Sequence, residues 1–235
     1  TSATSTTVVD ADRLILNDDG TMKQIAVTDL NTYLGNATKL DDLSDAKSEG
    51  TNFTRSLLIG HETTGTLSSD AQNNTGVGIA ALDAMTGSGH NNVAVGYAAL
   101  TALTSGGDNI AVGVEALATI TNGTKNVAIG HYALKKNTAN NGVALGHSAL
   151  EDNTSGLNNT ALGSNALNSN TIGGSNIAIG FWALDGADTE SNNLAIGSHA
   201  LGGAVAGGEY NVAIGNYSMD ANTSGDYNTA VGYAS

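Results

Sequence analysis

A short phrase, Asn-x-Ala-x-Gly with aliphatic residues at x, recurs along most of this 235-residue chain. It reads NNVAVGYAAL at 91–100, DNIAVGVEAL at 108–117 and KNVAIGHYAL at 125–134. Aligning the copies on their glycine gives a nearly regular series: Gly60, Gly78, Gly96, Gly113, Gly130, Gly146, Gly163, Gly180, Gly197, Gly215 and Gly232. Eleven copies at nearly constant spacing predict a solenoid in which each copy adds one coil.

The residues around each glycine predict a β-strand rather than a helix. Alternate side chains of a strand point to opposite faces, so the Val and Ile residues cover one face and the Ala residues the other. After the glycine comes x-x-Ala-Leu, a second apolar patch, and the rest of each period is Asn, Thr, Ser and Gly, which favour turns. Neither half of the repeat is long enough for the paired helices of a helical solenoid. Because both strand faces are apolar, both are expected to be buried.

A coil of about 17 residues is too thin to cover both faces of its own strand. The uncovered apolar face is therefore expected to pack against copies of the same chain in a closed cyclic assembly. We expect the small Ala residues to lie at that contact, where they let backbones approach closely. Replacing Ala128 or Ala178 with Leu would then overpack an interior shared between chains. A homotrimer is the favoured assembly, although the pattern by itself indicates only an oligomer.

Two columns of the repeat have a predicted structural role. Asparagine precedes the strand in nine copies, and stacked coils would place these side chains in a hydrogen-bonded ladder. The glycines are expected at a bend that needs positive φ or close backbone approach. The ladder residues are Asn74, Asn92, Asn109, Asn126, Asn159, Asn176, Asn193, Asn211 and Asn228, with Ser56 and Gly142 as the exceptions.

Composition argues against several classes of partner. Eight Lys and Arg residues against 22 Asp and Glu residues give a net charge of −14, and no Lys or Arg follows Lys136. Nucleic acids and anionic membrane surfaces need basic patches, so neither is an expected partner. No apolar run is long enough for membrane insertion. The chain has no Cys, so no disulfide or thiolate is involved. The start at Thr1 without Met suggests a fragment or a processed product.

From about Ser56 to Ser235 the repeats resemble the head repeats of YadA-type trimeric adhesins. That resemblance implies an all-β fold, a left-handed parallel β-roll of about eleven coils in a homotrimer. The period of about 17 residues and the added Ala-Leu patch depart from the usual bacterial heads. Repeats of this longer type are similar to those in tail-fibre proteins of tailed phages. On this basis residues 51–235 form the repeat domain.

Residues 1–50 are expected to form a separate attachment segment. RLILNDDGTMKQIAV at 13–27 reads as a β-hairpin that turns at 17–20, and TDLNTYLG at 28–35 reads as a short helix. Such a lead-in is similar to those of phage fibre and baseplate-associated proteins. Many phage fibres end in a chaperone domain that cleaves itself off after a serine, so Ser235 is a candidate maturation end. A boundary without functional meaning is the alternative, and the favoured one.

Few residues suggest catalysis or metal binding. His131 and His147 follow the repeat glycine in adjacent coils and should lie close together, but a metal site there is not favoured. The acidic loop with Asp185, Asp188 and Glu190 offers oxygen ligands for calcium, although a solvated turn is the favoured interpretation. No cofactor is predicted.

The two positions after each glycine vary while the rest of the repeat is kept, so recognition could be encoded there. Candidate receptor contacts are Tyr97, Tyr132, Phe181, Trp182 and Tyr217, although packing between protomers is the favoured interpretation of these side chains.

Together these features predict a structural and adhesive protein. The favoured hypothesis is a segment of a phage tail fibre located on the virion, with partners in its own trimer, in other tail or baseplate proteins and in a host glycan or protein. The alternative is the head of a bacterial trimeric adhesin at the cell surface. A glycan-cleaving enzyme would need paired acids at one cleft, and an ice-binding solenoid would need a regular Thr array, which Thr160 and Thr229 do not provide. We therefore expect no enzymatic activity.

Overall fold

The computed structural model describes residues 13–18, 21–26, 46–47, 56–59, 71–203 and 208–235, and in these ranges the regular structure is all β. The expected helix at 28–35 lies outside them. The strands are β1 (Arg13–Asp18), β2 (Thr21–Ala26), β3 (Ala46–Lys47), β4 (Leu57–Ile59), β5 (Thr75–Val77), β6 (Val93–Val95), β7 (Ile110–Val112), β8 (Val127–Ile129), β9 (Val143–Leu145), β10 (Thr160–Leu162), β11 (Ile177–Ile179), β12 (Leu194–Ile196), β13 (Val212–Ile214) and β14 (Thr229–Val231).

The predicted hairpin is present near the N-terminus. Strands β1 and β2 pair antiparallel over their whole length, from Arg13 with Ala26 to Asp18 with Thr21. The register leaves two residues, Asp19 and Gly20, between the strands. An Asp-Gly pair is a common connection of tight hairpins, because both residues adopt positive φ easily.

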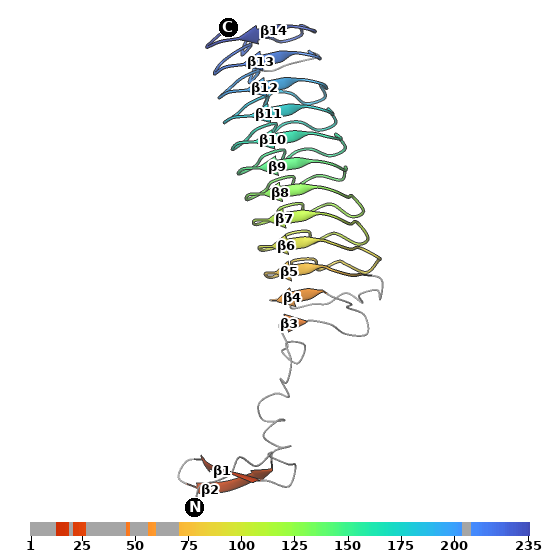
Figure 1. Ribbon diagram of the computed structural model, residues 1–235, viewed down its shortest axis with the longest axis vertical. Coiled ribbons are helices and arrows are strands. Elements are labelled where there is room, and N and C mark those ends of the chain that lie inside the picture. The colour runs from red at the N-terminus through yellow and green to blue at the C-terminus, as the bar shows by residue number, and fades with distance from the viewer. Residues whose placement is uncertain (1–12, 19–20, 27–45, 48–55, 60–70, 204–207) are drawn as a thin grey trace, which may run out of the picture.

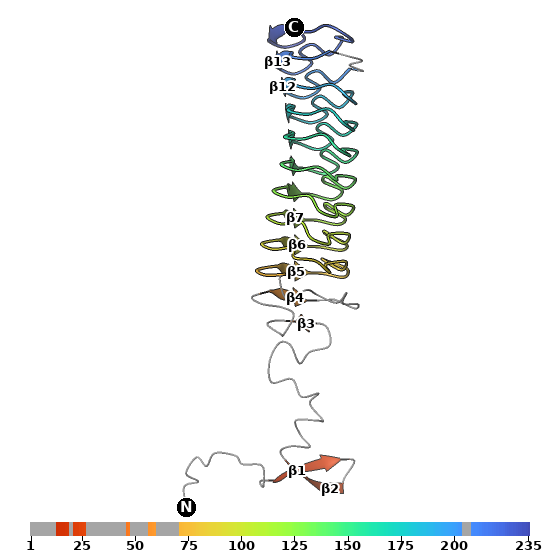
Figure 2. The same ribbon diagram turned by 90° about the vertical axis from the view of Figure 1, so that its right-hand side faces the viewer.

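The remaining strands form one long sheet. Strands β4 to β14 are parallel and lie in sequence order, and β3 pairs antiparallel with β4 at the N-terminal end of the sheet. Equivalent residues of successive repeats are partners, as in Ala111 with Ala128 and Ala161 with Ala178. The strands stack one above the other along the long axis with their turns aligned (Figures 1 and 2). The predicted parallel β-solenoid is therefore confirmed.

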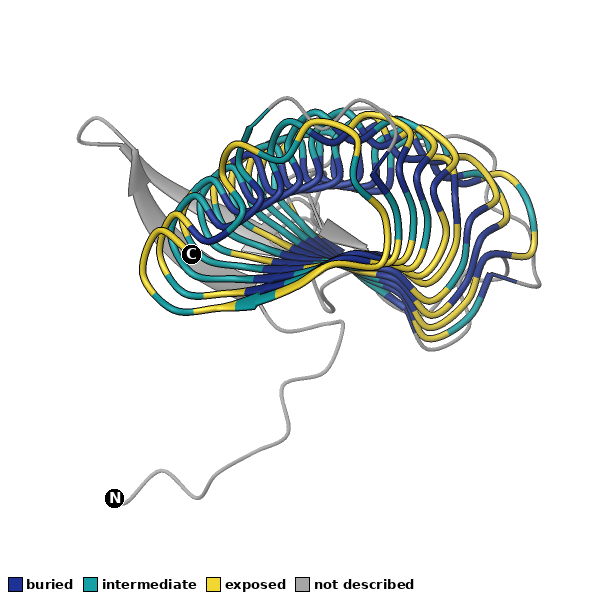
Figure 3. Cartoon of the chain, turned by 90° about the horizontal axis from the view of Figure 1, so that it is seen from above, coloured by how far each residue is buried: buried dark blue, intermediate teal, exposed yellow. Residues whose placement is uncertain are grey.

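The chain builds its own apolar core between the strand and the Ala-Leu turn. The central Ala of the strands from Ala94 to Ala213 is 0% exposed, and the Ala-Leu pairs, such as Ala133 and Leu134, are equally buried. Seen end-on, the buried residues follow the strand and the segment facing it, and the exposed residues lie toward the outer rim of the coil (Figure 3). The core is thin because the inward strand residue is only a methyl group, which lets the two layers approach closely.

This arrangement corrects two expectations. The Ala face is not a contact between chains, because Ala128 and Ala178 are fully buried inside the coil of their own chain. The other strand face is not buried by the chain: Ile110 and Ile177, for example, are each 40% exposed. A single coil thus covers one of its two apolar faces and leaves the other open. Replacing Ala128 or Ala178 with Leu would overpack the core of the chain itself.

Corners in the left-handed region close each coil. In the coil of β7, Asp108, Glu115 and Leu117 have φ of 60°, 53° and 52°, and equivalent residues recur in the other coils. Such a backbone costs energy for residues other than glycine. Hydrogen bonds to neighbouring coils hold it: the Glu115 N–H donates to the Tyr97 carbonyl of the preceding coil, and the Leu117 N–H donates to the Ala133 carbonyl of the following one. Each coil therefore depends on the coils on both sides.

The repeat glycine ends the strand at a backbone conformation that few other residues tolerate. From Gly78 to Gly232 its φ lies between 129° and 141°. A Cβ on Gly96 would lie 2.5 Å from the carbonyl oxygen of Gly113 in the next coil and 2.8 Å from its carbonyl carbon. Backbone strain and close approach between coils therefore both require glycine here.

Replacing Gly96 with Ala should separate these two effects when it is compared with Gly232→Ala. Gly232 has the same backbone, with φ of 138°, but the nearest atom to an added Cβ is 3.7 Å away. We expect Gly96→Ala to lower the free energy of unfolding in urea by about 1–3 kcal/mol more than Gly232→Ala does, because only Gly96→Ala forces two coils apart. Equal losses for the two variants would show that backbone strain alone fixes this column.

Candidate functional site

The buried asparagine column connects the backbones of successive coils. The Oδ1 of Asn92 accepts the backbone N–H of Asn109 at 3.0 Å, and the Oδ1 of Asn109 accepts that of Asn126 at 3.1 Å. The Nδ2 of Asn109 donates back to Asn92 Oδ1 at 3.0 Å and forward to the Gly123 carbonyl at 2.9 Å. The same backbone contact to Oδ1 continues through Asn176, Asn193, Asn211 and Asn228. Each side chain thus satisfies buried main-chain groups at a turn that has no strand pairing.

Gly142 interrupts this column, and a second column of asparagines lies beside the gap. The Gly142 N–H still donates to Asn126 Oδ1, at 2.8 Å. Asn137, seven residues after the repeat glycine, donates to the Ala139 carbonyl. Asn153 Nδ2 then donates to Asn137 Oδ1 at 2.6 Å, and Asn170 Nδ2 donates to Asn153 Oδ1 at 2.7 Å. Sequence reasoning missed this column because the equivalent positions hold Met85, Leu103 and Ile120 in earlier coils.

The second ladder ends at Ala187, where a buried acid takes over part of its role. Asn170 Oδ1 has no hydrogen-bond partner, since Ala187 has no amide to offer. In the same turn Glu190 is 4% exposed, and its Oε2 accepts the backbone N–H groups of Asp188 and Thr189 at 2.9 and 3.0 Å. The expectation of a solvated acidic turn is therefore wrong for Glu190, which replaces the Gly of other coils and binds the turn from within.

Sequence reasoning also missed a column of threonines that bond successive coils. The hydroxyls of Thr104, Thr138, Thr154 and Thr171 each donate to the backbone carbonyl of the equivalent residue one coil later, at 2.7 to 3.1 Å. Because the hydroxyl protons are used between coils, these residues stabilise the stack. The constant offset of these threonines from the repeat glycine was the signal that could have revealed them.

The outward side of the sheet, which we call the strand face, is a long apolar surface of the solenoid. It consists of the first and third residues of each parallel strand, and several of its aliphatic members are 36% to 45% exposed. Between β6 and β14 these residues are Val93, Val95, Ile110, Val112, Val127, Ile129, Val143, Leu145, Thr160, Leu162, Ile177, Ile179, Leu194, Ile196, Val212, Ile214, Thr229 and Val231. Strand pairing places like residues in two aliphatic rows along the rod.

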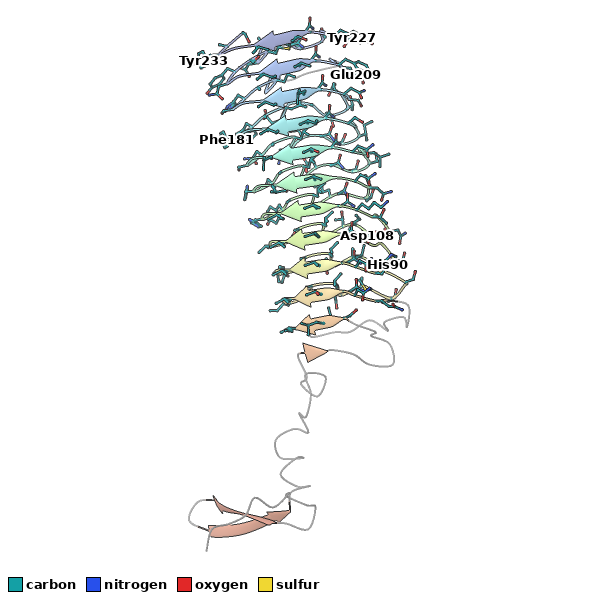
Figure 4. The ribbon with its side chains drawn as sticks, viewed as in Figure 1. His90, Asp108, Phe181, Glu209, Tyr227 and Tyr233 are labelled. Atoms are coloured by element: carbon teal, nitrogen blue, oxygen red, sulfur yellow. The ribbon has the colours of Figure 1, made fainter. Side chains whose placement is uncertain are left out.

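The variable positions after each glycine lie along one edge of the rod. Figure 4 shows Phe181 and Tyr233 at this edge, and His90, Asp108, Glu209 and Tyr227 at the opposite one. Among the candidate receptor contacts, Tyr97 lies two coils before Tyr132. The Nζ of Lys135 lies over the Tyr132 ring, 4.0 Å from the ring centre. Lys135 also pairs with Glu115 at 2.8 Å, and that hydrogen bond raises the pKa of the lysine. Tyr132 is therefore held by a cation–π contact with Lys135.

The other candidates belong to a continuous column that we call the aromatic edge, defined as Phe181, Trp182, His199, Tyr217 and Tyr233. Ring centres lie 6.0 Å apart for Phe181 and Trp182, and 5.6 Å apart for Phe181 and His199. His199 stacks on Tyr217 at 5.1 Å with 13° between the planes, and Tyr217 meets Tyr233 edge-on at 6.1 Å. His199 and Tyr233 were not among the expected receptor contacts. Both occupy the variable positions directly after the repeat glycine, and that placement could have revealed them from the sequence.

The ionisable side chains that the sequence singled out have the following places in the described part of the chain. His131 and His147 are neighbours as expected, with ring centres 5.3 Å apart. Across the described ranges, however, no three His, Cys, Asp or Glu residues are placed to share a metal ion. Burial raises the pKa of the Asp185 carboxyl, and its Oδ1 has no hydrogen-bond partner. In the last coil Ser235 Oγ lies 2.9 Å from Ser218 Oγ, and its role as a maturation end stays a prediction.

No family model matches the chain, and no curated protein or solved structure matches it either. In the part of the chain that the structure describes, no helix is long and apolar enough to cross a bilayer.

Replacing Asn109 with Ala should strongly destabilise the rod. The change removes the acceptor of the buried Asn126 N–H and the donor to the Gly123 carbonyl, so the free energy of unfolding should fall by at least about 2 kcal/mol. Asn122→Ala is the control: Asn122 is exposed and accepts hydrogen bonds only at the surface, so its removal should cost less than about 0.5 kcal/mol. Urea unfolding of both variants checks this, and a similar small loss for both would contradict the proposed importance of the ladder.

Extending the second ladder should stabilise the protein. In the double variant Ala187→Asn/Glu190→Gly, the new amide can donate to Asn170 Oδ1 and the turn regains the glycine of other coils. We expect a gain of about 1 kcal/mol in the free energy of unfolding. The single variant Glu190→Gly should lose stability, because the N–H groups of Asp188 and Thr189 lose their acceptor. A double variant no more stable than that single one would refute the compensation between these positions.

Proposed function

We propose that this chain is a structural and adhesive segment of a homotrimeric fibre, and that the fibre is a phage tail fibre used in host attachment. The observation that carries the proposal is the strand face. It presents two rows of aliphatic side chains along the solenoid, and the chain itself leaves them open. Soluble monomers seldom expose a contiguous apolar surface of this extent.

Association through the strand face is energetically reasonable. Parallel sheets are normally covered on both faces, and here the chain supplies only the inner cover. Completing the burial of a half-exposed Val or Ile contributes on the order of 1 kcal/mol. Repeated over the rows of the strand face, that contribution exceeds the roughly 4–15 kcal/mol that association costs in lost freedom. The uniformity of the rows also means that identical rods match along their length.

We propose that the rods lie parallel in a cyclic arrangement. Parallel chains related by a rotation axis along the rod close into a finite ring, so all N-terminal segments emerge at one end and can join the same attachment point. The resemblance of the repeats to trimeric heads supports three chains. The hairpin β1–β2 supports the fibre over the bacterial adhesin head, which remains the second candidate because its repeat has the same strand pattern.

Catalysis is not part of the proposal. Glycoside hydrolysis needs two carboxyl groups facing one another across a substrate. Of the acids in the C-terminal third, Glu190 binds its own turn, and the Asp226 carboxylate accepts the backbone N–H of Glu209. A role in shape and contact accounts for these placements better than acid–base chemistry does.

The assembly can be tested with charges on the strand face. In Ile129→Lys/Ile177→Lys, burial of the lysines against partner chains is too costly to be tolerated. The light-scattering mass after size-exclusion chromatography should fall from about three times the 23.5 kDa chain mass to the mass of one chain. Circular dichroism should keep its β signal, because the core of each chain does not involve these side chains.

The matched control adds the same charge elsewhere. Ile79→Lys/Val114→Lys changes two residues that are 53% and 40% exposed in the column just after the repeat glycine. It should leave the mass unchanged. A monomeric unmodified chain would overturn the assembly, and loss of the trimer in the control alone would move the contact from the strand face to the edge.

A further inference from the structure

We infer that the aromatic edge is a binding surface for uncharged polysaccharide, bound along the axis of the rod. The inference deepens the proposed attachment function and rests on it, because it assigns a ligand class to the surface that would make the attachment. It concerns Phe181, Trp182, His199, Tyr217 and Tyr233, which come from four successive coils and follow directly on the strands.

The first observation is that these rings are exposed while forming one column. Phe181 is 50% exposed, Tyr217 is 42% exposed and Tyr233 is 77% exposed. Rings of this kind in a chain with 4% aromatic residues are a concentrated apolar surface. Their contacts with one another, at 5.1 to 6.1 Å between centres, fix the side chains before any ligand arrives. A preorganised surface loses less conformational entropy on binding.

The second observation is the spacing. Stacked coils repeat at about 4.8 Å, so an aromatic or imidazole ring recurs at roughly that interval along the edge. That interval is comparable to the length of one sugar unit in an extended polysaccharide. Sugar rings offer C–H faces that pack on aromatic faces, and a linear chain of them would meet a new ring at each coil.

The third observation is charge. No Lys or Arg follows Lys136, so the aromatic edge has no cationic residue within its own coils, and eight acids lie in that part of the chain. Anionic glycans and phosphate groups would be repelled. Hydroxyl groups, in contrast, find acceptors and donors in a hollow that Tyr217 lines together with Asp220, Asn222 and Ser235. Aromatic faces beside a carboxylate, an amide and a hydroxyl suit a neutral sugar, which presents both C–H and O–H groups.

Trp182 provides the readout, because it is the only Trp in the chain. The full chain is titrated with neutral oligosaccharides built from hexose, 6-deoxyhexose and N-acetylhexosamine units, and Trp emission is recorded. Polygalacturonate serves as the charged probe. We expect a saturable change in emission with at least one neutral series and none with polygalacturonate.

The test variant is Phe181→Ser/Tyr217→Asn, which introduces residues that other coils already carry in the same columns at Ser164 and Asn165. It keeps the Trp reporter, and binding should weaken by about tenfold or more through loss of two stacking contacts. The control is Tyr97→Ser, which removes a ring that is 54% exposed in an earlier coil and should leave the affinity unchanged.

The outcomes separate this inference from the proposed fibre. No response to any neutral series, or tighter binding of polygalacturonate, overturns the assignment and leaves the trimer untouched. The light-scattering mass of Phe181→Ser/Tyr217→Asn should equal that of the unmodified chain. Loss of assembly in that variant would show that the rings pack between protomers, and this too overturns the polysaccharide surface. A monomeric unmodified chain that still binds the sugars would overturn the fibre alone.

Discussion

The structure depends on one constraint: the polar backbone of each coil is satisfied mainly by the coils before and after it. Strand pairing meets this need over only three residues per coil, as in Val127–Ile129. Elsewhere the bonds come from corner residues such as Glu115 and Leu117, whose N–H groups point in opposite directions along the rod. An isolated coil would therefore carry both strained corners and unpaired buried groups. Stability is shared by the stack, as expected for a protein whose units contact only their neighbours.

The same constraint explains why identical residues recur where they do. A side chain that reaches the next coil meets its own equivalent, so asparagine can both donate to and accept from its copy. Asn92, Asn109 and Asn126 use this property inside the rod. The second ladder shows that the solution is local: it begins at Asn137, beside the gap at Gly142, and stops at Ala187, where the Glu190 carboxylate serves the same turn. Different columns therefore satisfy the buried main-chain groups in different coils, and Asn170 Oδ1 is left without a partner where the second ladder stops.

The strand face and the edge after each glycine differ in how their residues vary along the rod. The strand face is uniform along the rod, which suits contact with identical rods, whereas the edge after each glycine varies from coil to coil. The aromatic edge gathers its rings in four coils near the C-terminal end, and the Tyr132 region forms a separate ionic and aromatic cluster. A scaffold of this kind can change its recognition residues without changing its fold, because the variable side chains add nothing to the core.

The sequence by itself determined the solenoid, its strands and its inward Asn column, because a short repeat of nearly constant length forces each residue type into a column and strand alternation fixes two faces. It also predicted that Gly96 and its equivalents would need unusual backbone. It could not decide which apolar face each chain covers. Only the tertiary structure placed Ala128 inside the coil and left Ile129 outside, because the Ala side of the strand packs in the core with the buried Ala-Leu turn, whereas Ile129 stays 41% exposed. The Asn137 ladder, the burial of Glu190 and the contact of Phe181 with His199 were likewise decided by stacking, since each depends on what the neighbouring coil supplies.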